Sequence, residues 1–297
     1  VFGGRECKDD DSNGESRNGR MIKMKKFSVL MSLYYKEKPE YFRQCMYSLL
    51  NQTIKPEQIV IVKDGPLPAK LDEELKMWIG KNPYLYTIVP LKENRGLGIA
   101  LAEGIQYCRN ELVARMDTDD IAVKNRFEEQ LKEFEKDSKL DICGSSILEF
   151  EGTIKNVVSR RNVPLEHNQI KKYQKYRDAF NHMTVMYRKS MVLKAGNYQS
   201  CLLMEDTLLW VHMIQAGAKC KNISRPLVYA RVGSDMYERR GGWNYFKKYK
   251  AGRERVLETK YINIGEYLFT ISVQFLVALI PNQVRSVLYK KILRNKT

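Results

Sequence analysis

Between residues 26 and 143, short apolar runs alternate with amphipathic stretches, and this alternation restricts the possible folds more than any other feature. Several runs have the length and composition of buried strands, whereas the intervening stretches carry apolar residues at helical spacing. Strands are expected over 27–33, 58–62, 86–91, 112–116 and 140–143, and helices over 39–50, 71–79, 98–108 and 126–136. Helices of this length between successive strands predict an α/β fold, with a parallel sheet covered on both faces.

The chain is long enough for one large α/β domain or for one domain with an appendage. Its net positive charge is unusually large for a globular protein. The net charge is +16, and the segment from Arg239 to Thr297 holds 13 Lys or Arg against 3 Asp or Glu. Such a field attracts anionic lipid, nucleic acid or acidic polymer. A solvated basic face without a partner is the plain alternative.

The six cysteines are scattered, and no two have the Cys-x-x-Cys spacing of a zinc or thioredoxin-like site. Most lie among apolar residues, so we expect small buried hydrophobic side chains and a reducing compartment. The N-terminal residues 1–20 are polar and lack periodicity, which predicts a disordered extension before a natural start at Met21, with no signal peptide.

Three carboxylates follow the apolar run 112–116, at Asp117, Asp119 and Asp120. Ligands of open α/β sheets bind at the carboxyl ends of the strands, which is where these side chains would lie. Clustered oxygens suit Mg²⁺ or Mn²⁺, which proteins usually hold with one or two carboxylates plus substrate phosphates. A turn is the competing interpretation, with Asp120 capping a helix that would start near Val123.

Polar residues also end the neighbouring strands of the predicted sheet. Asp64 follows the second strand, residues 94–98 follow the third, and Glu205 with Asp206 opens a later helix expected over 206–215. Each position alone fits a turn or a helix start. Together at one edge they indicate a ligand site.

In this order and spacing, the chain resembles the family 2 inverting glycosyltransferases of the GT-A fold over about residues 26–232. The segments that carry the resemblance are 28–34, 48–53, 59–65, 93–97, 115–120, 182–186 and 204–206. It is most similar to bacterial members that build O-antigen, capsule or exopolysaccharide repeat units. The resemblance implies a Rossmann-like, mostly parallel sheet with flanking helices and a basic, amphipathic C-terminal helical region.

The resemblance assigns donor-binding roles to residues at the strand ends. Asp117 and Asp119 would hold Mn²⁺ or Mg²⁺ against the diphosphate of a nucleotide sugar, where the metal stabilises the leaving group. Asp64 would accept a hydrogen bond from the nucleobase, with uracil expected. Ser32 and Tyr34 would form a wall of the nucleotide site. Arg95 is a candidate phosphate or nucleobase contact, because guanidinium pairs well with phosphate oxygens; a surface charge is its alternative.

The resemblance also assigns acceptor-side roles. Asp206 matches the general base, because inversion requires one displacement with the acceptor hydroxyl deprotonated as it attacks. Glu205 would help to bind the acceptor. His182 would line the acceptor side of the cleft, although a lone histidine among apolar residues is more often part of the core. For Asp120 two interpretations have equal weight: it lies behind the metal ligands and supports them, or it caps a helix. Tyr229, Arg231, Arg239 and Arg240 would close over the diphosphate or hold a lipid-diphosphate acceptor, and a solvated basic face fits them equally well.

The C-terminal part predicts membrane attachment rather than membrane crossing. Residues 267–280 are nearly all apolar, but about 20 residues are needed to span a bilayer, so we expect a buried or an interfacial helix. The processive relatives have a Gln-x-x-Arg-Trp motif and several membrane spans, which this chain lacks, so one sugar per acceptor is expected. We therefore divide the chain into an extension (1–20), a GT-A domain (21–235) and a basic helical membrane-associating tail (236–297).

The predicted function is transfer of one sugar, expected from a UDP-hexose, to an undecaprenyl-diphosphate-linked saccharide at the cytoplasmic face of the inner membrane, where the tail meets anionic lipid. A sugar-phosphate nucleotidyltransferase is one alternative, but the Gly-rich loop typical of that class does not follow the first strand. A non-enzymatic basic module that binds anionic polymer is another. Nucleic acid is not an expected partner, because no nucleic-acid motif is present.

Overall fold

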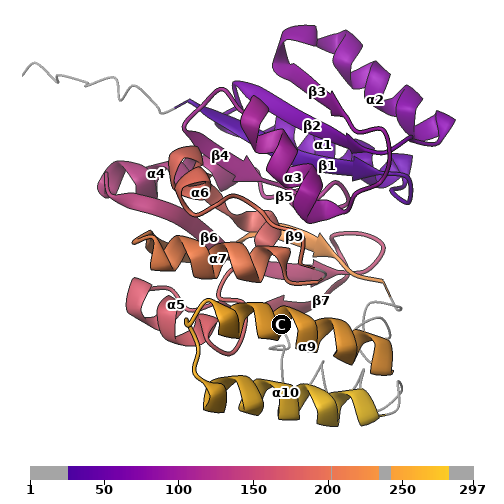
Figure 1. Ribbon diagram of the computed structural model, residues 1–297. Helices are drawn as coiled ribbons and strands as arrows, with labels where there is room; N and C mark the ends of the chain where they lie inside the picture. Colours follow the sequence, from indigo (N-terminus) through magenta and orange to yellow (C-terminus); the bar gives the residue numbers. More distant parts are fainter. Residues whose placement is uncertain (1–25, 202, 234–241, 281–297) are drawn as a thin grey trace, which may run out of the picture.

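The computed structural model describes residues 26–201, 203–233 and 242–280, and every structural statement below refers to this part of the chain. A nine-stranded sheet runs through the molecule with helices on both faces, and a pair of C-terminal helices lies at one end (Figure 1). The strand order is β3-β2-β1-β4-β8-β6-β9-β5, and β7 pairs with the outer part of β6.

The first half of the sheet is parallel, as the sequence predicts. It contains β1 (Phe27–Tyr34), β2 (Gln58–Asp64), β3 (Tyr86–Pro90) and β4 (Leu112–Arg115), which are connected through α1 (Pro39–Leu50), α2 (Ala69–Lys81) and α3 (Leu97–Gly104). The helix expected over 98–108 ends early and continues as a 3₁₀ turn, Ile105–Tyr107. A Cβ on Gly104 would meet side chains of Val62 and Leu30 at 2.5 and 2.6 Å, so glycine lets α3 approach the sheet closely.

The second half of the sheet is mixed, so that the whole agrees with the mostly parallel sheet that the family resemblance implies. It contains β5 (Ile121–Ala122), β6 (Leu140–Phe150), β7 (Val157–Arg161), β8 (Met186–Arg188) and β9 (Lys219–Arg231). The strand expected over 140–143 extends to Phe150, and β8 lies between it and β4, antiparallel to both. A three-residue strand leaves no periodic pattern in the sequence, so this insertion could not be predicted.

The core lies on both faces of the sheet. Alternate residues of β1 point to opposite sides, so that Met31 joins the cluster under α1, α2 and α4 (Arg126–Lys136), whereas Leu30 joins the cluster under α3 and α7 (Glu205–Gln215). Burial on both faces explains why β1 is nearly continuously apolar. The five cysteines of the described segments are buried and unpaired, which confirms their predicted role as small hydrophobic residues.

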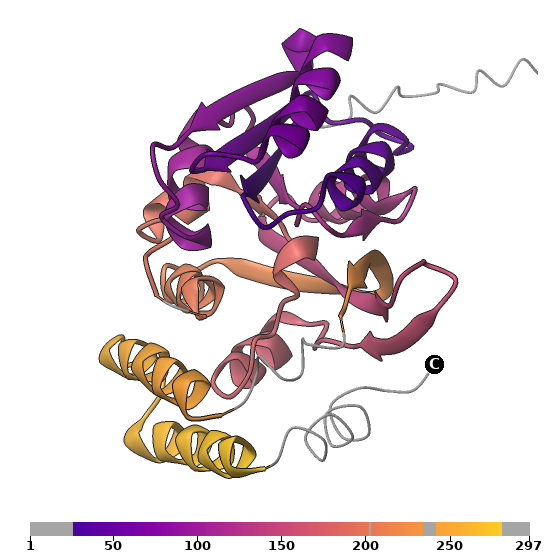
Figure 2. The same cartoon turned by 90° about the vertical axis from the view of Figure 1, so that its right-hand side faces the viewer.

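Three shorter helical segments and a helical hairpin complete the fold. The segments are α5 (His167–Gln174), the 3₁₀ turn His182–Thr184 and α6 (Lys189–Lys194). The hairpin consists of α9 (Gly242–Glu258) and α10 (Ile264–Leu279), which lie side by side in both views (Figures 1 and 2). A third apolar cluster joins α7 to this hairpin through Leu208, Val211 and Val256. Within the described segments, no helix has both the length and the hydropathy that membrane crossing requires.

Candidate active site

A cavity of about 910 Å³ opens at the carboxyl ends of β1, β2 and β4. The parallel register places Tyr34 of β1 beside Asp64 of β2, and the loop after β4 brings Asp117 and Asp119 to the same edge. Ser32 lines the cavity as well. Five of the residues singled out from the sequence therefore come together, at the edge where open α/β sheets bind ligands.

Asp64 organises the loop that follows β3. It is 2% exposed, and its carboxylate accepts hydrogen bonds from the Asn94 side chain at 2.9 Å and from the backbone N–H groups of Arg95 at 2.7 Å and Gly96 at 3.0 Å. Gly65 has φ +87°, and a Cβ there would meet the Asn94 nitrogen at 2.6 Å, so glycine permits this close approach. Asp64 thus shapes the cavity wall, a role that sequence reasoning missed.

The side chain of Arg95 lies outside the cavity. Its backbone N–H is bound to Asp64, while the side chain is exposed and is not part of the cavity lining. The neighbours Asn94 and Gly96 supply that part of the wall. A contact from the Arg95 guanidinium to phosphate or nucleobase stays a prediction.

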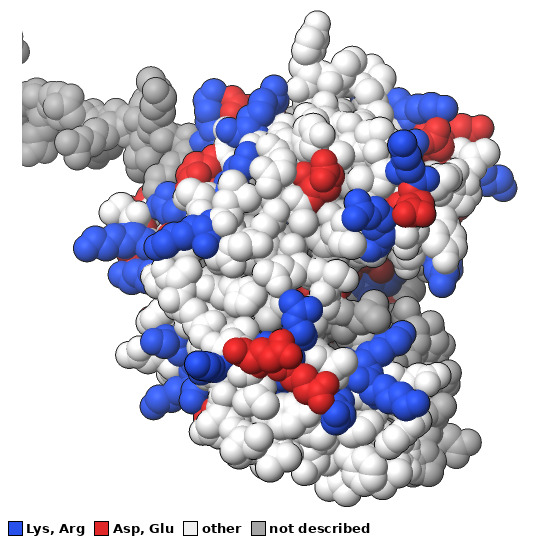
Figure 3. Space-filling view, viewed as in Figure 1, with Lys and Arg blue, Asp and Glu red and all other residues white. Residues whose placement is uncertain are grey.

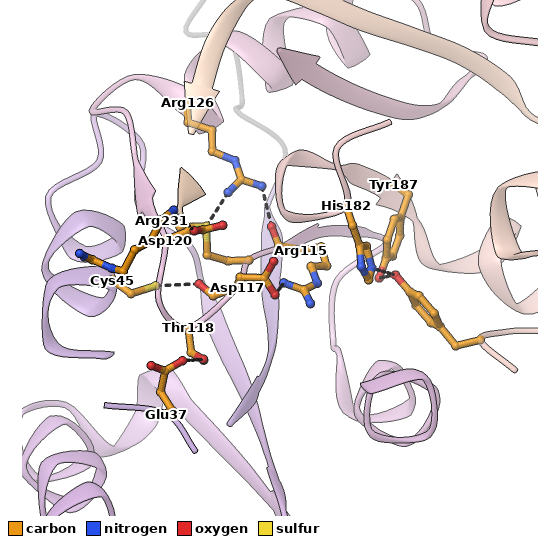
Figure 4. A network of polar contacts seen from close by, with 12 residues as sticks. Glu37, Cys45, Arg115, Asp117, Thr118, Asp120, Arg126, His182, Tyr187 and Arg231 are labelled. Atoms are coloured by element: carbon orange, nitrogen blue, oxygen red, sulfur yellow. Dashed lines mark hydrogen bonds and ion pairs between the residues drawn. The ribbon is translucent and has the colours of Figure 1, made fainter. Parts of the chain in front are cut away.

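The loop after β4 concentrates negative charge beside the cavity. Asp117 is ion-paired with Arg115 (Figure 4), and both Asp117 and Asp119 are half-buried. Burial, together with the neighbouring carboxylates of Asp117 and Glu37, raises the pKa of Asp119 to about 7. Burial also raises the pKa of Glu37, which accepts a hydrogen bond from Thr118. Sequence reasoning missed Glu37, which ends the turn after β1 and carries no motif of its own.

Asp120 does not cap a helix, so that interpretation is wrong. The helix begins at Arg126 with Asn125 at its N-cap position, five residues after Asp120. Asp120 is instead buried and accepts a hydrogen bond from the backbone N–H of Arg231 at 2.7 Å. Burial, followed by the charges of Asp119 and Asp117, raises the pKa of Asp120 well above its usual range. The residue anchors the end of β9 behind the cavity.

Arg231 connects three segments around the cavity and is not part of a solvated basic face. Its Nε donates to the Asp119 carbonyl at 3.0 Å and its Nη2 donates to Gln44 of α1 at 2.6 Å. The guanidinium also lies 3.9 Å from the ring centroid of Tyr41 and 4.6 Å from that of Phe150. The Arg231 guanidinium therefore holds this loop through the Asp119 carbonyl rather than through the Asp119 carboxylate.

Two further basic residues and one tyrosine were grouped with Arg231 in the sequence. Tyr229 packs edge-on against Phe150, with ring centroids 6.4 Å apart, so its side chain supports the packing of neighbouring strands. Arg239 and Arg240 lie outside the described residues.

The loop after β4 fits a divalent cation. Asp117 and Asp119 present hard oxygen donors to the cavity, and burial, followed by the neighbouring carboxylates, raises the pKa of Asp119, a shift that a bound cation would relieve. In the part of the chain that the structure describes, no group of three or more His, Cys, Asp or Glu is placed to hold a metal. Two carboxylates are nevertheless the usual protein share of a Mg²⁺ or Mn²⁺ site when phosphates and water supply the other ligands.

A second acidic cluster lies at the N-terminus of α7, where the helix dipole favours carboxylates. It contains Glu205, Asp206 and Asp178. Burial, followed by the charges of Asp178 and Glu205, raises the pKa of Asp206 well above its usual range. Thr207 joins the cluster, because its N–H donates to Asp206 at 2.8 Å and its hydroxyl donates to Asp178. Burial raises the pKa of Glu205 as well.

His182 lies in an aromatic environment, and Figure 4 shows it beside Tyr187. Its Nε2 is 3.0 Å from the Tyr198 hydroxyl, and its ring packs edge-on against Trp210 at 5.8 Å. Burial, with the nearby Arg115 guanidinium, lowers the pKa of His182 well below its usual value, so the imidazole is neutral. The packing resembles a core histidine, and contact with an acceptor stays a prediction.

The second cluster lies directly behind the wall of the cavity. A Cβ on Gly98 would meet the Glu205 Cβ and the Gln199 carbonyl, each at 3.0 Å, and the preceding residue Leu97 lines the cavity. Glu205 and Asp206 are half-buried and are not part of the cavity lining itself. Arg115 bridges the two regions, because it is ion-paired with Asp117 and its charge also acts on Glu205.

Comparison with known proteins places this site in a family context. Residues 28–193 match the model of Glycosyl transferase family 2. The chain is 38% identical over 265 residues to the amylovoran biosynthesis glycosyltransferase AmsE of Erwinia amylovora, covering 89% of this chain and 98% of that protein. It is 33% identical over 276 residues to the UDP-Gal:alpha-D-GlcNAc-diphosphoundecaprenol beta-1,3-galactosyltransferase of Escherichia coli, covering 91% and 97%.

Solved structures share the fold at low sequence identity. S. aureus TarS 1-349 in complex with UDP-GlcNAc aligns with a TM-score of 0.59 and 16% identity, covering 78% of this chain and 66% of that chain. The mannosyltransferase PcManGT from Pyrobaculum calidifontis, in complex with GDP-Man and Mn²⁺, aligns with a TM-score of 0.59 and 11% identity, covering 88% and 71%. At these identities the likeness concerns the fold alone.

Proposed function

Because the chain belongs to glycosyl transferase family 2 and has the predicted GT-A fold, we propose that it transfers one sugar from a UDP-sugar to a lipid-diphosphate-linked saccharide. We further propose inversion at the anomeric carbon and a role in bacterial surface polysaccharide synthesis. The relative named for a diphosphoundecaprenol acceptor supports this choice of acceptor, and the relative named for amylovoran biosynthesis supports a role in polysaccharide synthesis. Family membership favours a transferase over the nucleotidyltransferase and the non-enzymatic basic module.

The observation that carries the proposal is the meeting of Asp64, Asp117 and Asp119 in one cavity. The base of the donor would lie toward Asp64, and its diphosphate toward the loop after β4. Lys36 and Lys38, which also line the cavity, would add positive charge near the phosphates. When bound by Asp117 and Asp119, Mn²⁺ or Mg²⁺ would neutralise the charge that develops on the departing diphosphate.

Asp206 is the proposed general base. It accepts the proton of the acceptor hydroxyl while that oxygen forms its bond to the anomeric carbon. The bond from this carbon to the diphosphate oxygen breaks in the same step, and the nucleoside diphosphate leaves with the electron pair. The raised pKa makes the ionised carboxylate a stronger base than an ordinary aspartate. Glu205, which packs against Gly98 behind the cavity wall, would help to hold the acceptor saccharide.

A lipid-linked acceptor requires the enzyme to work at a membrane surface. We propose the cytoplasmic face of the inner membrane, since nucleotide sugars are the donors and the C-terminal part carries a large excess of Lys and Arg. Basic segments near anionic lipid attach proteins peripherally when apolar burial assists them.

The proposal is tested by donor hydrolysis over a panel of nucleotide sugars, with Mn²⁺ or with chelator, using wild type and Asp119→Ala. We expect release of nucleotide from one UDP-sugar, which chelator and the substitution both abolish. Asp137→Ala is the matched control, because this exposed aspartate lies outside the cavity and pairs only with Lys219 among ion-pair partners in the described part. Folded protein that neither hydrolyses nor binds any donor in the presence of metal would contradict the proposal.

A further inference from the structure

Helix α10 turns its apolar face toward the outside of the protein and its more polar face toward the protein. Seven of its large apolar side chains are exposed, the most exposed being Ile264 at 65% and Leu279 at 63%. The seven are Ile264, Leu268, Phe269, Val273, Phe275, Leu276 and Leu279. A helix of a soluble domain normally turns such a face toward the core. The buried residues of α10 are Tyr267, Thr270 and Gln274, which all carry a polar group.

Directional polar contacts hold α10 in this orientation. Arg253 of α9 is 1% exposed, and its Nε donates to the Thr270 hydroxyl at 3.2 Å while its Nη2 donates to the Lys175 carbonyl at 2.6 Å. The Tyr267 hydroxyl donates to Glu254 at 3.3 Å. Turning the apolar face inward would remove the Thr270 hydroxyl from the buried Arg253 and the Tyr267 hydroxyl from Glu254, and the loss of a hydrogen bond is costly for a buried charged group. The outward face is therefore built into the hairpin.

The exposed face is unusual within this molecule. Of the 18 large apolar side chains exposed in the described segments, seven belong to α10, whereas the rest are spread over many elements. Large contiguous apolar patches on a soluble protein mark sites of interaction with proteins or membranes. White, uncharged side chains cover the end of the molecule that α10 forms (Figure 3).

The chemistry around this face fits lipid better than protein. The one charged residue of α10, Glu266, is neutralised by Lys175 at 2.8 Å. At the edge of the face, Trp243 of α9 contacts Phe275 with centroids 6.3 Å apart, and the exposed Lys247 lies 6.0 Å from the Trp243 ring. Tryptophan and lysine beside an apolar surface are typical of the boundary between headgroups and acyl chains.

We propose that α10 lies in the plane of a bilayer that contains anionic lipid, with its exposed apolar face against the acyl chains and Lys247 toward the headgroups. The 16 residues of α10 measure about 24 Å, which is shorter than the hydrocarbon core of about 30 Å, so the helix suits the interface rather than a span. This deepens the proposed function, on which it rests for the membrane-bound acceptor, and it assigns the docking surface.

The test is co-sedimentation of the full chain with vesicles of phosphatidylcholine, with and without phosphatidylglycerol. We expect binding that is stronger with phosphatidylglycerol and weaker at high salt. Substitution Leu268→Ser with Leu276→Ser removes two exposed leucines and should weaken partitioning by about tenfold per leucine. Both side chains are more than half exposed, so folding should be retained. Met77→Ser with Tyr84→Ser is the matched control, since it removes exposed apolar side chains near α2 and should leave binding unchanged.

An environment-sensitive fluorophore attached to the Leu276→Cys variant shows what covers the face. The unsubstituted chain is treated with the same reagent, so that fluorescence from labelled native cysteines can be subtracted. Emission typical of water that shifts to the blue when vesicles are added supports the proposal. Apolar emission in buffer alone, or a dimer in light scattering that the double serine substitution dissociates, would mean that another segment or a second copy occupies the face. Either result, or equal vesicle binding by wild type and the double variant, overturns it.

Donor hydrolysis separates this inference from the proposed function. The double serine variant should release nucleotide from the donor at the wild-type rate in the absence of vesicles, because α10 is remote from the cavity lining. Absence of donor turnover with intact α10-dependent vesicle binding would contradict the enzymatic proposal alone. Turnover without vesicle binding would contradict the docking surface alone.

Discussion

The two acidic clusters of the site contain the same kinds of side chain in different surroundings. Around Asp119, carboxylates face an open cavity, and the Arg231 guanidinium donates to the Asp119 backbone carbonyl rather than to its carboxylate. Around Asp206, carboxylates lie behind the cavity wall at a helix N-terminus. Burial raises the pKa in both clusters. The open cluster is suited to neutralisation by a cation, whereas the closed cluster is suited to neutralisation by a proton.

This difference supports the proposal that the two clusters act in different steps of one reaction. A cation-binding cluster acts on the leaving group, and a proton-accepting cluster acts on the nucleophile. Arg115 lies between them, paired with Asp117 and acting on His182 and Glu205 through its charge. The predictions below follow in order of decreasing expected effect.

Replacing the proposed base should have the largest effect. Asp206→Asn keeps the size of the side chain but removes the proton acceptor, so kcat for sugar transfer should fall by about 10³-fold. Donor affinity, measured by calorimetry, should be unchanged because the cavity is intact. If donor affinity fell as far as kcat, the two clusters would not be functionally separate.

Metal binding should distinguish the clusters without reference to activity. Mn²⁺ at about 100 times its dissociation constant should stabilise the wild type by about 2.7 kcal/mol, observed as a rise in Tm. Asp206→Asn should keep this rise and Asp119→Asn should lose it. The same rise in both variants would show that the cation binds elsewhere.

The pH dependence of stability should reveal the cost of crowding charge around Asp119. Its pKa is about 7 in the folded protein and about 4 in the unfolded chain, so between these values the folded state binds more protons. Its contribution to stability is therefore present below pH 4 and is lost as the pH rises to about 7. Without metal, Asp119→Asn should be more stable than wild type by about 1–3 kcal/mol at pH 8.

That gain should shrink toward pH 4, which urea titrations at several pH values would measure. Asp137→Asn provides the control, because the paired Lys219 lowers the pKa of Asp137 and the predicted sign is opposite. A gain for Asp119→Asn that did not vary with pH would exclude titration of Asp119 as its cause.

Loosening the loop of the open cluster should have the smallest effect. Lysine cannot reproduce the planar guanidinium contacts of Arg231 to the Asp119 carbonyl, Gln44 and the Tyr41 ring. Arg231→Lys should lower kcat/KM by about tenfold and stability by about 1–2 kcal/mol. Arg109→Lys, at an exposed position outside the cavity lining, should change neither value. Unchanged kinetics for Arg231→Lys would mean that the loop is set by other contacts.

Local patterns were sufficient where each element carries its own periodicity. The helices α1 and α4 begin and end at the predicted residues, because Phe42, Cys45, Met46 and Leu49 already define a buried face in α1. The strands of the parallel half were also predicted, as was the meeting of Asp64, Asp117 and Asp119, since parallel strands bring their carboxyl ends to one edge.

Contacts between distant residues could not be read from local patterns. The insertion of β8 between β4 and β6 depends on pairings across more than 40 residues, and Asp120 reaches Arg231 across 111 residues. For α10 the sequence determined an apolar helix too short to cross a bilayer. Which face points outward was decided only by the tertiary structure, because the buried Arg253 must keep its polar partners on the inner side.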